Sequence, residues 1–350
     1  MRDTILYDSA LRLFGDHVSP QVLAAAEAGE WPAALWRAVD EAGYLDVLAE
    51  GPQGMVEAVA ILRAAGHRAA PIPLPETMLA RWLYAVSRVE PPAGPLSIAL
   101  AEPGEPGQYT PVPWGGVAEA VAVISGSSFA LMARDRLRFA PRISLAGESR
   151  DVLAAVENAI TPTLPSPAIP GSSPERGGSE KGHIPLPNTI SADYARGVGA
   201  LMRAAQMAGA MEAALGLATT YANDRVQFGR PIGKFQAIQQ QLALLAEEAA
   251  ASLVAIESAA ICFAEGRQSA EFALAAAKIR AGEAAGAVAE IAHQVHGAIG
   301  FTEEHSLHYL TRRLWSWRDE FGDEAYWAAL LGRRIAASGG AGLWPLITTP

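Results

Sequence analysis

The chain has 350 residues, of which 50% are apolar and 18% charged, so it can form two or three globular domains and is too apolar to be disordered. Its formal net charge of −10 excludes general binding to nucleic-acid phosphates, which needs clustered cations. No apolar run approaches the roughly 20 residues of a transmembrane helix, the start of the chain lacks the pattern of a secretion signal, and the single cysteine fits a reducing compartment. We therefore expect a cytoplasmic protein with no membrane or nucleic-acid partner.

The first part of the chain is predicted to be helical and the next part to be a small β-domain. Apolar residues recur at three- and four-residue steps from about Ser9 to Val86, which indicates an all-helical N-terminal domain over residues 1–95. Short β-branched and alternating runs, separated by Gly and Pro, then predict a β-domain over residues 96–158. The expected strands lie at 97–100, 117–125, 129–133 and 137–140.

The second half combines an irregular segment with long helices. Residues 159–190 are rich in Pro, Gly and Ser, which favours a flexible insertion over a functional lid. Residues 191–340 are predicted to form a four-helix bundle, and residues 341–350 a tail. One apolar stripe of this bundle runs over seven turns and contains Ile238, Leu242, Leu245, Ala249, Leu253, Ile256, Ala260 and Phe263. The single cysteine, Cys262, is expected to be a buried, inert thiol.

The break between two of these helices carries polar residues. Gly229, Pro231 and Gly233 end one helix before another begins. The guanidinium group of Arg225 and the amides of Gln227 and Gln236 are suited to an anionic, flat ligand rich in heteroatoms. Taken alone, the spacing fits an ordinary helix hairpin equally well.

The order of residues in this break resembles the acyl-CoA dehydrogenase family. The run Arg225-x-Gln227-Phe228-Gly229-x-Pro231-Ile232, followed by Phe235-Gln236-Ala237-Ile238-Gln239, matches the family's connection between the first two helices of its C-terminal bundle. The resemblance implies an α-β-α architecture that ends in a four-helix bundle. It also implies that Arg225 and Gln236 contact the FAD of a neighbouring subunit, with Gln227 and Phe228 in the same cofactor site.

A second motif follows the third bundle helix. The run Gln294-Val-His-Gly-Ala-Ile-Gly-Phe-Thr-Glu-Glu304 is similar to the family's Gln-x-x-Gly-Gly-x-Gly motif. By that resemblance, Gln294, Gly297 and Ala298 contact the adenylate and pyrophosphate of FAD. Without the family, the same residues predict only a helix end and a turn.

A weaker resemblance concerns the β-domain. Ala101-Glu-Pro-Gly104 is similar to the family's Thr-Glu-Pro-Gly segment near the flavin ring, but Ala101 stands at the Thr position. No counterpart of the family's Trp-Ile-Thr strand follows. The resemblance therefore gives less support for flavin contacts from the β-domain than for those from the two bundle motifs.

Four of the seven histidines lie near the second motif. His293, His296, His305 and His308 have carboxylates close by in the sequence, which could complete a metal site. No HExxH or Cys/His pattern is present. We therefore expect capping and surface roles for these histidines, and keep a metal-binding helical protein as a remote alternative.

The family's catalytic base has no counterpart in this chain. In the family, a carboxylate removes the α-proton of the acyl thioester while the β-hydrogen leaves as hydride to the flavin. The two positions that carry this base in family members correspond to Phe321 and Gly199 here. Glu320 and Asp323 are the nearest carboxylates, and an offset of one residue rotates a helical side chain by about 100°. Glu320 is therefore a weak candidate for the base.

Two functions remain open on this basis. The first is an FAD-dependent acyl-CoA dehydrogenase that forms a 2,3-enoyl-CoA and passes electrons to an electron-transfer flavoprotein. The second is a non-catalytic subunit that completes the FAD site of a homologue carrying the Glu. Short bacterial members that resemble this chain, with Phe-Gly-Asp in place of Tyr-Glu-Gly-Thr, pair with such a homologue. Either function implies a homo-oligomer or hetero-oligomer, and branched, aromatic and steroid side-chain acyl-CoAs all stay open as substrates.

Overall fold

The first described part of the chain is helical, as predicted. The computed structural model describes residues 2–51, 53–102, 107–156 and 191–348, so the expected insertion at 159–190 lies outside the described residues. Ser19 accepts a hydrogen bond from the Val22 N–H at 3.3 Å and Pro20 opens the second helix. Gly43, with a φ of +73°, follows the end of the third. The elements are α1 (Arg2–His17), α2 (Pro20–Glu27), α3 (Ala33–Glu41), η1 (Val47–Ala49), α4 (Gly54–His67) and α5 (Leu74–Val86).

The N-terminal helices pack closely on the bundle. Helix α4 crosses α6 (Ala192–Asp224), and two glycines make the crossing possible. A Cβ atom on Gly66 would lie 1.9 Å from the carbonyl oxygen of Gln206, and one on Gly209 would lie 1.8 Å from that of Arg63. The two backbones are therefore in direct contact, so the N-terminal helical domain packs directly against the bundle.

The β-domain consists of two small sheets. One has the strand order β1-β3-β4, with β1 (Leu96–Leu100) parallel to β3 (Ala120–Ser125), and β3 antiparallel to β4 (Ser128–Ala133). The other is antiparallel and has the order β2-β6-β5. Its strands are β2 (Val112–Pro113), β6 (Arg150–Val156) and β5 (Leu137–Ala140).

The predicted strands at 97–100, 129–133 and 137–140 are confirmed, and the other strands correct the prediction. The strand expected from 117 begins at Ala120, because the N–H groups of Val117 and Ala118 turn back to the carbonyl of Trp114. Strands β2 and β6 were not predicted. Strand β6 begins with Arg150 and Asp151, which are buried because polar partners hydrogen-bond to their side chains. In the sequence alone, two adjacent charged residues indicate a polar loop, so the start of this strand was missed.

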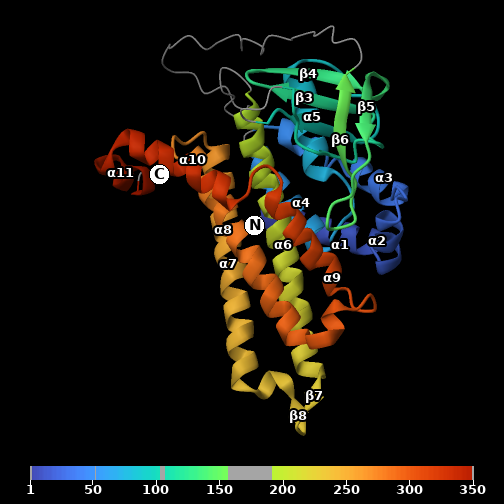
Figure 1. Ribbon diagram of the computed structural model, residues 1–350, viewed down its shortest axis with the longest axis vertical. Coiled ribbons are helices and arrows are strands. Elements are labelled where there is room, and N and C mark those ends of the chain that lie inside the picture. The colour runs from blue at the N-terminus through green and yellow to red at the C-terminus, as the bar shows by residue number, and fades with distance from the viewer. Residues whose placement is uncertain (1, 52, 103–106, 157–190, 349–350) are drawn as a thin grey trace.

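The rest of the described chain is a helical bundle built around α6. Its other helices are α7 (Gln236–Ala264), α8 (Ala270–His296), α9 (Leu307–Asp319) and α10 (Glu324–Ser338). The β-domain lies at one end of α6 and the hairpin of β7 (Val226–Gln227) and β8 (Arg230–Pro231) at the other (Figure 1). The predicted stripe on α7 is confirmed: Leu245, Ala249, Ile256, Ala260 and Phe263 are buried, and Ile238, Leu242 and Leu253 pack against them.

The single cysteine and the C-terminal tail were two further predictions from the sequence. Cys262 is buried, as predicted, with 7% of its surface exposed. The tail expected at 341–350 contains a short helix, α11 (Leu343–Thr348), after Gly339 with a φ of +74°. None of the described helices is long and apolar enough to cross a membrane.

Candidate functional site

The hairpin that leaves α6 presents an aromatic residue in a strained conformation. Gln227 pairs with Arg230, so Phe228 and Gly229 are the central residues of the turn, with φ angles of +51° and +77°. A left-handed phenylalanine is uncommon and costs about 1 kcal/mol or more. Phe228 is also 92% exposed. The Phe228 ring is therefore exposed to solvent at the end of the bundle that carries the hairpin.

The predicted cofactor residues of this hairpin are exposed around that ring. The backbone carbonyl of Arg225 accepts a hydrogen bond from the Ile232 N–H at 2.8 Å, which closes the hairpin. Among the described residues, none hydrogen-bonds to the side chains of Arg225, Gln227 or Gln236. Three donor groups are therefore free to bind a ligand.

The second motif lies at the same end of the bundle. The ring of Tyr221 on α6 stacks on His296 of α8, with ring centroids 4.8 Å apart, so the ends of the two helices are adjacent. Gln294 is exposed, and Gly297 ends α8 with a φ of +62° and no atom within 4 Å of an added Cβ. Ala298 is exposed in the 3-10 helix η4 (Gly297–Phe301) that follows. The structure thus brings both sequence motifs together at one end.

The expectation of capping and surface roles is wrong for two of the four nearby histidines, His293 and His296, whereas His305 accepts a hydrogen bond of 3.2 Å from the Leu307 N–H at the start of α9. His293 and His296 are only 7% and 2% exposed, and their rings stack on Phe301 and Tyr221 at centroid distances of 4.2 and 4.8 Å. Burial lowers the pKa of both imidazoles, and the neighbouring histidines lower that of His293 further. Within the described ranges, no three His, Cys, Asp or Glu side chains are placed to hold a metal ion. These imidazoles pack the bundle end instead.

This group of donors fits the chemistry of FAD. A guanidinium group and a glycine turn open to solvent suit a pyrophosphate, and free amides suit the heteroatoms of a flavin or an adenine ring. All of them face solvent and lie at the end of the bundle that carries the β7–β8 hairpin (Figure 1). The residues present therefore fit FAD.

A cleft lies toward the opposite end of α6. It has a volume of about 520 Å³ and separates the β-domain from the bundle. From the β-domain it is lined by Ile98, Glu102, Thr110, Pro111, Pro113, Arg142, Ser144 and Arg150, and from the bundle by Arg196, Ser316, residues 319–323 and Tyr326. Gly199 and Arg225 are about 39 Å apart along α6 at 1.5 Å per residue. The exposed donors of one chain are therefore remote from its own cleft.

The two positions that carry the base in the family meet at this cleft. A Cβ atom on Gly199 would lie 2.4 Å from Cε1 of Phe321, so the phenyl ring takes the space of any side chain on α6 at that point. Phe321 has a φ of +58° and Gly322 a φ of +93°, which form the turn between α9 and α10. The turn is closed by a hydrogen bond of 3.1 Å from Trp327 Nε1 to the Phe321 carbonyl. A hydrocarbon ring thus fills the space at both positions where the family resemblance predicts the carboxylate.

Glu320, the weak candidate for the base, is held in ion pairs. Its carboxylate lies 2.7 Å from Arg150 Nε of strand β6 and 2.7 Å from Arg203 Nη2 of α6. Arg203 also donates to Glu76 of α5. The side chain of Glu320 is 17% exposed. This carboxylate joins the β-domain to the bundle, and Arg203 extends the network to the N-terminal domain, so its geometry is that of an anchor between domains.

Sequence reasoning missed this buried network. Glu148, 4% exposed, bonds Arg150 at 2.9 Å and Arg313 at 3.0 Å. Burial raises the pKa of Glu148, but Arg313 and Arg150 outweigh burial and leave the pKa below its usual value. For Glu76 burial wins over Arg203, and its pKa is raised. An arginine such as Arg203 within an Ala-rich buried helix was the sequence signal that a buried acid must face it.

Lys278 fixes the end of α9, next to the turn that contains Phe321. Its side chain is fully buried on α8 and donates a hydrogen bond of 2.6 Å to the carbonyl of Arg318, at the end of α9. Burial lowers the pKa of Lys278 to about 7, although Glu320 acts in the opposite direction. The turn that contains Phe321 is thus fixed by Lys278 on one side and by Glu320 on another.

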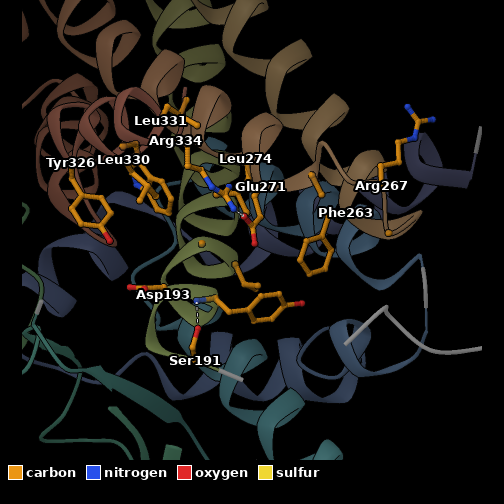
Figure 2. Close-up of a pocket in the computed structure, with 16 residues that line it drawn as sticks. Ser191, Asp193, Phe263, Arg267, Glu271, Leu274, Tyr326, Leu330, Leu331 and Arg334 are labelled. Carbon is orange, nitrogen blue, oxygen red and sulfur yellow. Dashed lines mark hydrogen bonds and ion pairs between the residues drawn. The ribbon is translucent and has the colours of Figure 1, made fainter. Parts of the chain in front are cut away.

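A second cavity of about 510 Å³ lies between the start of α6, the end of α7, the start of α8, and α10. Figure 2 shows its apolar lining, with Glu271 and Arg334 reaching toward each other and Arg267 pointing away. Tyr326 lines both this cavity and the cleft. None of the residues predicted for catalysis or cofactor binding lines this second cavity, so the cleft at Phe321 is the better candidate for substrate.

Comparisons with known proteins agree with these observations. Residues 192–336 match the sequence model described as "Acyl-CoA dehydrogenase, C-terminal domain". The chain is 31% identical over 323 residues to acyl-CoA dehydrogenase IpdE2 of Mycolicibacterium smegmatis, covering 88% of this chain and 91% of that protein.

Two solved structures share the fold of nearly the whole chain. The Tcur3481-Tcur3483 steroid ACAD G363A variant has a TM-score of 0.78 at 23% identity, over 96% of this chain and 98% of that one. The ChsE4-ChsE5 complex from Mycobacterium tuberculosis has a TM-score of 0.73 at 22% identity, over 99% of this chain and 98% of the matched chain.

Proposed function

The chain belongs to the acyl-CoA dehydrogenase family, FAD-dependent oxidoreductases acting on the CH–CH bond of acyl-CoA, and we propose that it holds its FAD jointly with a second chain. The observation that carries this proposal is the separation of the exposed donors from the cleft by about 39 Å along α6. In this proposal each flavin lies at the cleft of one chain and is capped by the bundle end of another. Electrons leave to an electron-transfer flavoprotein.

Each residue at the bundle end has a role in this arrangement. Arg225 pairs with a phosphate, for which a guanidinium fork is well suited. The amides of Gln227, Gln236 and Gln294 donate to ring and ribose oxygens, and Phe228 packs against the ligand or the second chain. Gly297 and Ala298 let the backbone approach the pyrophosphate closely. Bound FAD supplies the acceptor for the β-hydride of the thioester.

A second candidate function is favoured by the contact between Phe321 and Gly199. With both base positions occupied by a phenyl ring and a glycine, and Glu320 held by two arginines, this chain lacks a free carboxylate at either base position. It would then be the non-catalytic subunit of a heteromeric acyl-CoA dehydrogenase, and a homologue would supply the base. Two of the similar solved structures carry paired names, Tcur3481-Tcur3483 and ChsE4-ChsE5, which supports such a pairing.

Flavin spectroscopy separates the two candidates. The chain is purified alone and after co-expression with a homologue that carries the Glu, and each sample is titrated anaerobically with branched, aromatic and steroid side-chain acyl-CoAs. Flavin that bleaches in the lone chain identifies an autonomous dehydrogenase. Flavin and bleaching that appear only with the homologue identify the partner subunit, and a lack of flavin in both samples contradicts both candidates.

A further inference from the structure

A cluster of histidines connects the two sequence motifs that are predicted to bind FAD. The Arg225 N–H donates a hydrogen bond of 2.8 Å to the carbonyl of Tyr221, whose ring stacks on His296 with centroids 4.8 Å apart. His296 directly precedes Gly297 and lies two residues after Gln294. One stacked pair of rings therefore joins the first motif to the second.

Two of these histidines also support the backbone of η4, which carries the glycine turn of the second motif. A Cβ atom on Gly300 would lie 3.2 Å from Nδ1 of His293 and 3.0 Å from Cβ of His296, so both side chains pack directly against η4. The ring of Phe301 stacks on His293 with centroids 4.2 Å apart. The position of η4 therefore depends on how these two imidazoles are packed.

Hydrogen bonds fix the neutral form of both imidazoles. Nδ1 of His296 donates to the carbonyl of Ala292 at 2.7 Å, which leaves Nε2 as the unprotonated nitrogen of the neutral ring. Nε2 of His293 donates to the Thr311 hydroxyl at 2.9 Å, because that hydroxyl itself donates to the Leu307 carbonyl at 3.4 Å. Among the described residues, none bonds to the second nitrogen of either ring, and both of these nitrogens are buried. A proton added there would be a buried donor without an acceptor, which is costly.

The groups around the cluster also favour neutral rings. In the part of the chain that the structure describes, none of the four histidines forms an ion pair with a carboxylate, and the glutamates at 303–304 are exposed. The ring of His305 lies 4.5 Å from that of His296, so a positive charge on one ring disfavours a charge on the other. The charge of His308 acts on His293 in the same way. The other rings and hydroxyls that contact the cluster are uncharged: Tyr221 of α6, Phe301 of η4, and Tyr309, Thr311 and Trp315 of α9.

We propose that His293 and His296 position the second motif for FAD, and that their protonation at mildly acidic pH loosens the bundle end and releases the cofactor. This inference rests on the proposed function, because FAD is taken as the ligand of this end. Burial lowers the pKa of both imidazoles below the usual 6.5, so the loosened end, with solvated rings, binds protons more readily than the packed end. The packed end is therefore most stable above pH 6.5 and loses stability as the pH falls below it.

A direct effect of charge on the ligand would have the opposite sign. A cationic imidazole beside a pyrophosphate attracts it, so protonation without loosening would hold FAD more tightly at low pH. The unprotonated nitrogens of His293 and His296 are buried, so they cannot reach a ligand while the rings stay packed. The direction of the pH effect on FAD retention therefore separates a positioning role from direct contact.

The test is the pH dependence of flavin release. The FAD-containing form is shifted from pH 7.5 to pH 5.5, and wild type should release fluorescent flavin at least about tenfold faster at the lower pH, since each histidine can contribute up to about tenfold per pH unit. The double variant His293→Gln/His296→Asn cannot be protonated at these positions, and its amides can replace the bonds to Thr311 and Ala292. Its release rate should change less than about twofold. The matched control is His17→Asn, at a half-buried histidine of α1, which should respond to pH like wild type.

A measurement on the flavin-free form keeps this inference separate from the proposed function. Between pH 7.5 and pH 5.5, the thermal midpoint of the flavin-free wild type should fall more than that of the double variant. This comparison decides the inference if the double variant does not retain flavin at pH 7.5. Parallel midpoints, equal acceleration of release in wild type and the double variant, or slower release at pH 5.5 overturns the inference. Full flavin content in Arg225→Ala would instead contradict the proposed function, whatever the histidine variants show.

Discussion

Gly199 and Phe321 share one space between α6 and the turn that follows α9. Their contact explains why position 199 carries no carboxylate: a side chain there would collide with the ring at 321. The left-handed φ of Phe321, +58°, is uncommon for an aromatic residue and is maintained by anchors on either side of it. Glu320 binds two arginines before it, and the Asp323 side chain accepts from the Tyr326 N–H at 2.7 Å after it. The turn therefore keeps its shape without a base.

This contact predicts an asymmetry between two glycines of the same helix. Gly199→Ala should destabilise the chain by about 1–3 kcal/mol, because the added methyl group overpacks against the Phe321 ring. Gly216→Ala should be neutral or stabilising by up to about 1 kcal/mol, because nothing lies within 4 Å of its added Cβ. Urea unfolding of both variants measures the difference.

A third variant checks that the ring is the cause. Adding Phe321→Ala to Gly199→Ala should remove most of the extra cost, since the space would then be open. If Gly199→Ala is as stable as Gly216→Ala, or if the double variant shows no coupling, the ring at 321 does not block position 199.

At the scale of elements, Lys278 couples α8 to the end of α9 and makes stability depend on pH. The pKa of Lys278 is about 7 in the folded chain against a usual 10.5, because the side chain is buried. Between these values the unfolded chain binds more protons than the folded chain, so stability rises with pH across this window, by up to about 1.4 kcal/mol per pH unit. Below pH 7 both states are protonated and the contribution no longer changes.

Replacing the lysine should remove this slope. Lys278→Met is expected to flatten the rise in unfolding free energy between pH 7 and pH 9, whatever its effect on stability at a single pH. Lys234→Met, at an exposed lysine before α7, should keep the wild-type slope. Urea midpoints at several pH values give the comparison, and parallel slopes for wild type and Lys278→Met would show that the buried amine does not titrate in this range.

The elements that the sequence predicted are those with local signals. The long apolar stripe of α7 and the glycine after α8 are both set by neighbours in the sequence, so the bundle was predictable. Strand β6 was missed because its buried Arg150 and Asp151 depend on partners far along the chain, such as Glu320 and Gly116. Family resemblance located positions 199 and 321 separately, but their contact depends on the packing of α6 against a distant turn. The burial of His293 and His296 was missed for the same reason.

At the scale of the whole molecule, the three domains meet around α6, and the end of α6 next to the β7–β8 hairpin stays exposed to solvent. The network of Glu76, Arg203, Glu320, Arg150 and Glu148 joins the N-terminal domain, the bundle and the β-domain beside the cleft. The opposite end carries Arg225, Gln236 and Gln294, all exposed, next to an outward Phe228. A flavin shared between chains would use both ends of α6, the cleft of one chain and the exposed donors of another.

The most direct test of the shared flavin is the flavin content of the Arg225→Ala variant. The variant is purified in the form that contains FAD, alone or with the Glu-bearing homologue, and the ratio of flavin to protein absorbance is compared with wild type and with Arg37→Ala, an exposed arginine of α3. Arg225→Ala should lose most of its flavin while its thermal midpoint in the flavin-free form stays unchanged, and Arg37→Ala should keep wild-type flavin. Full flavin content in Arg225→Ala would contradict the account, because the bundle end would then not hold the cofactor.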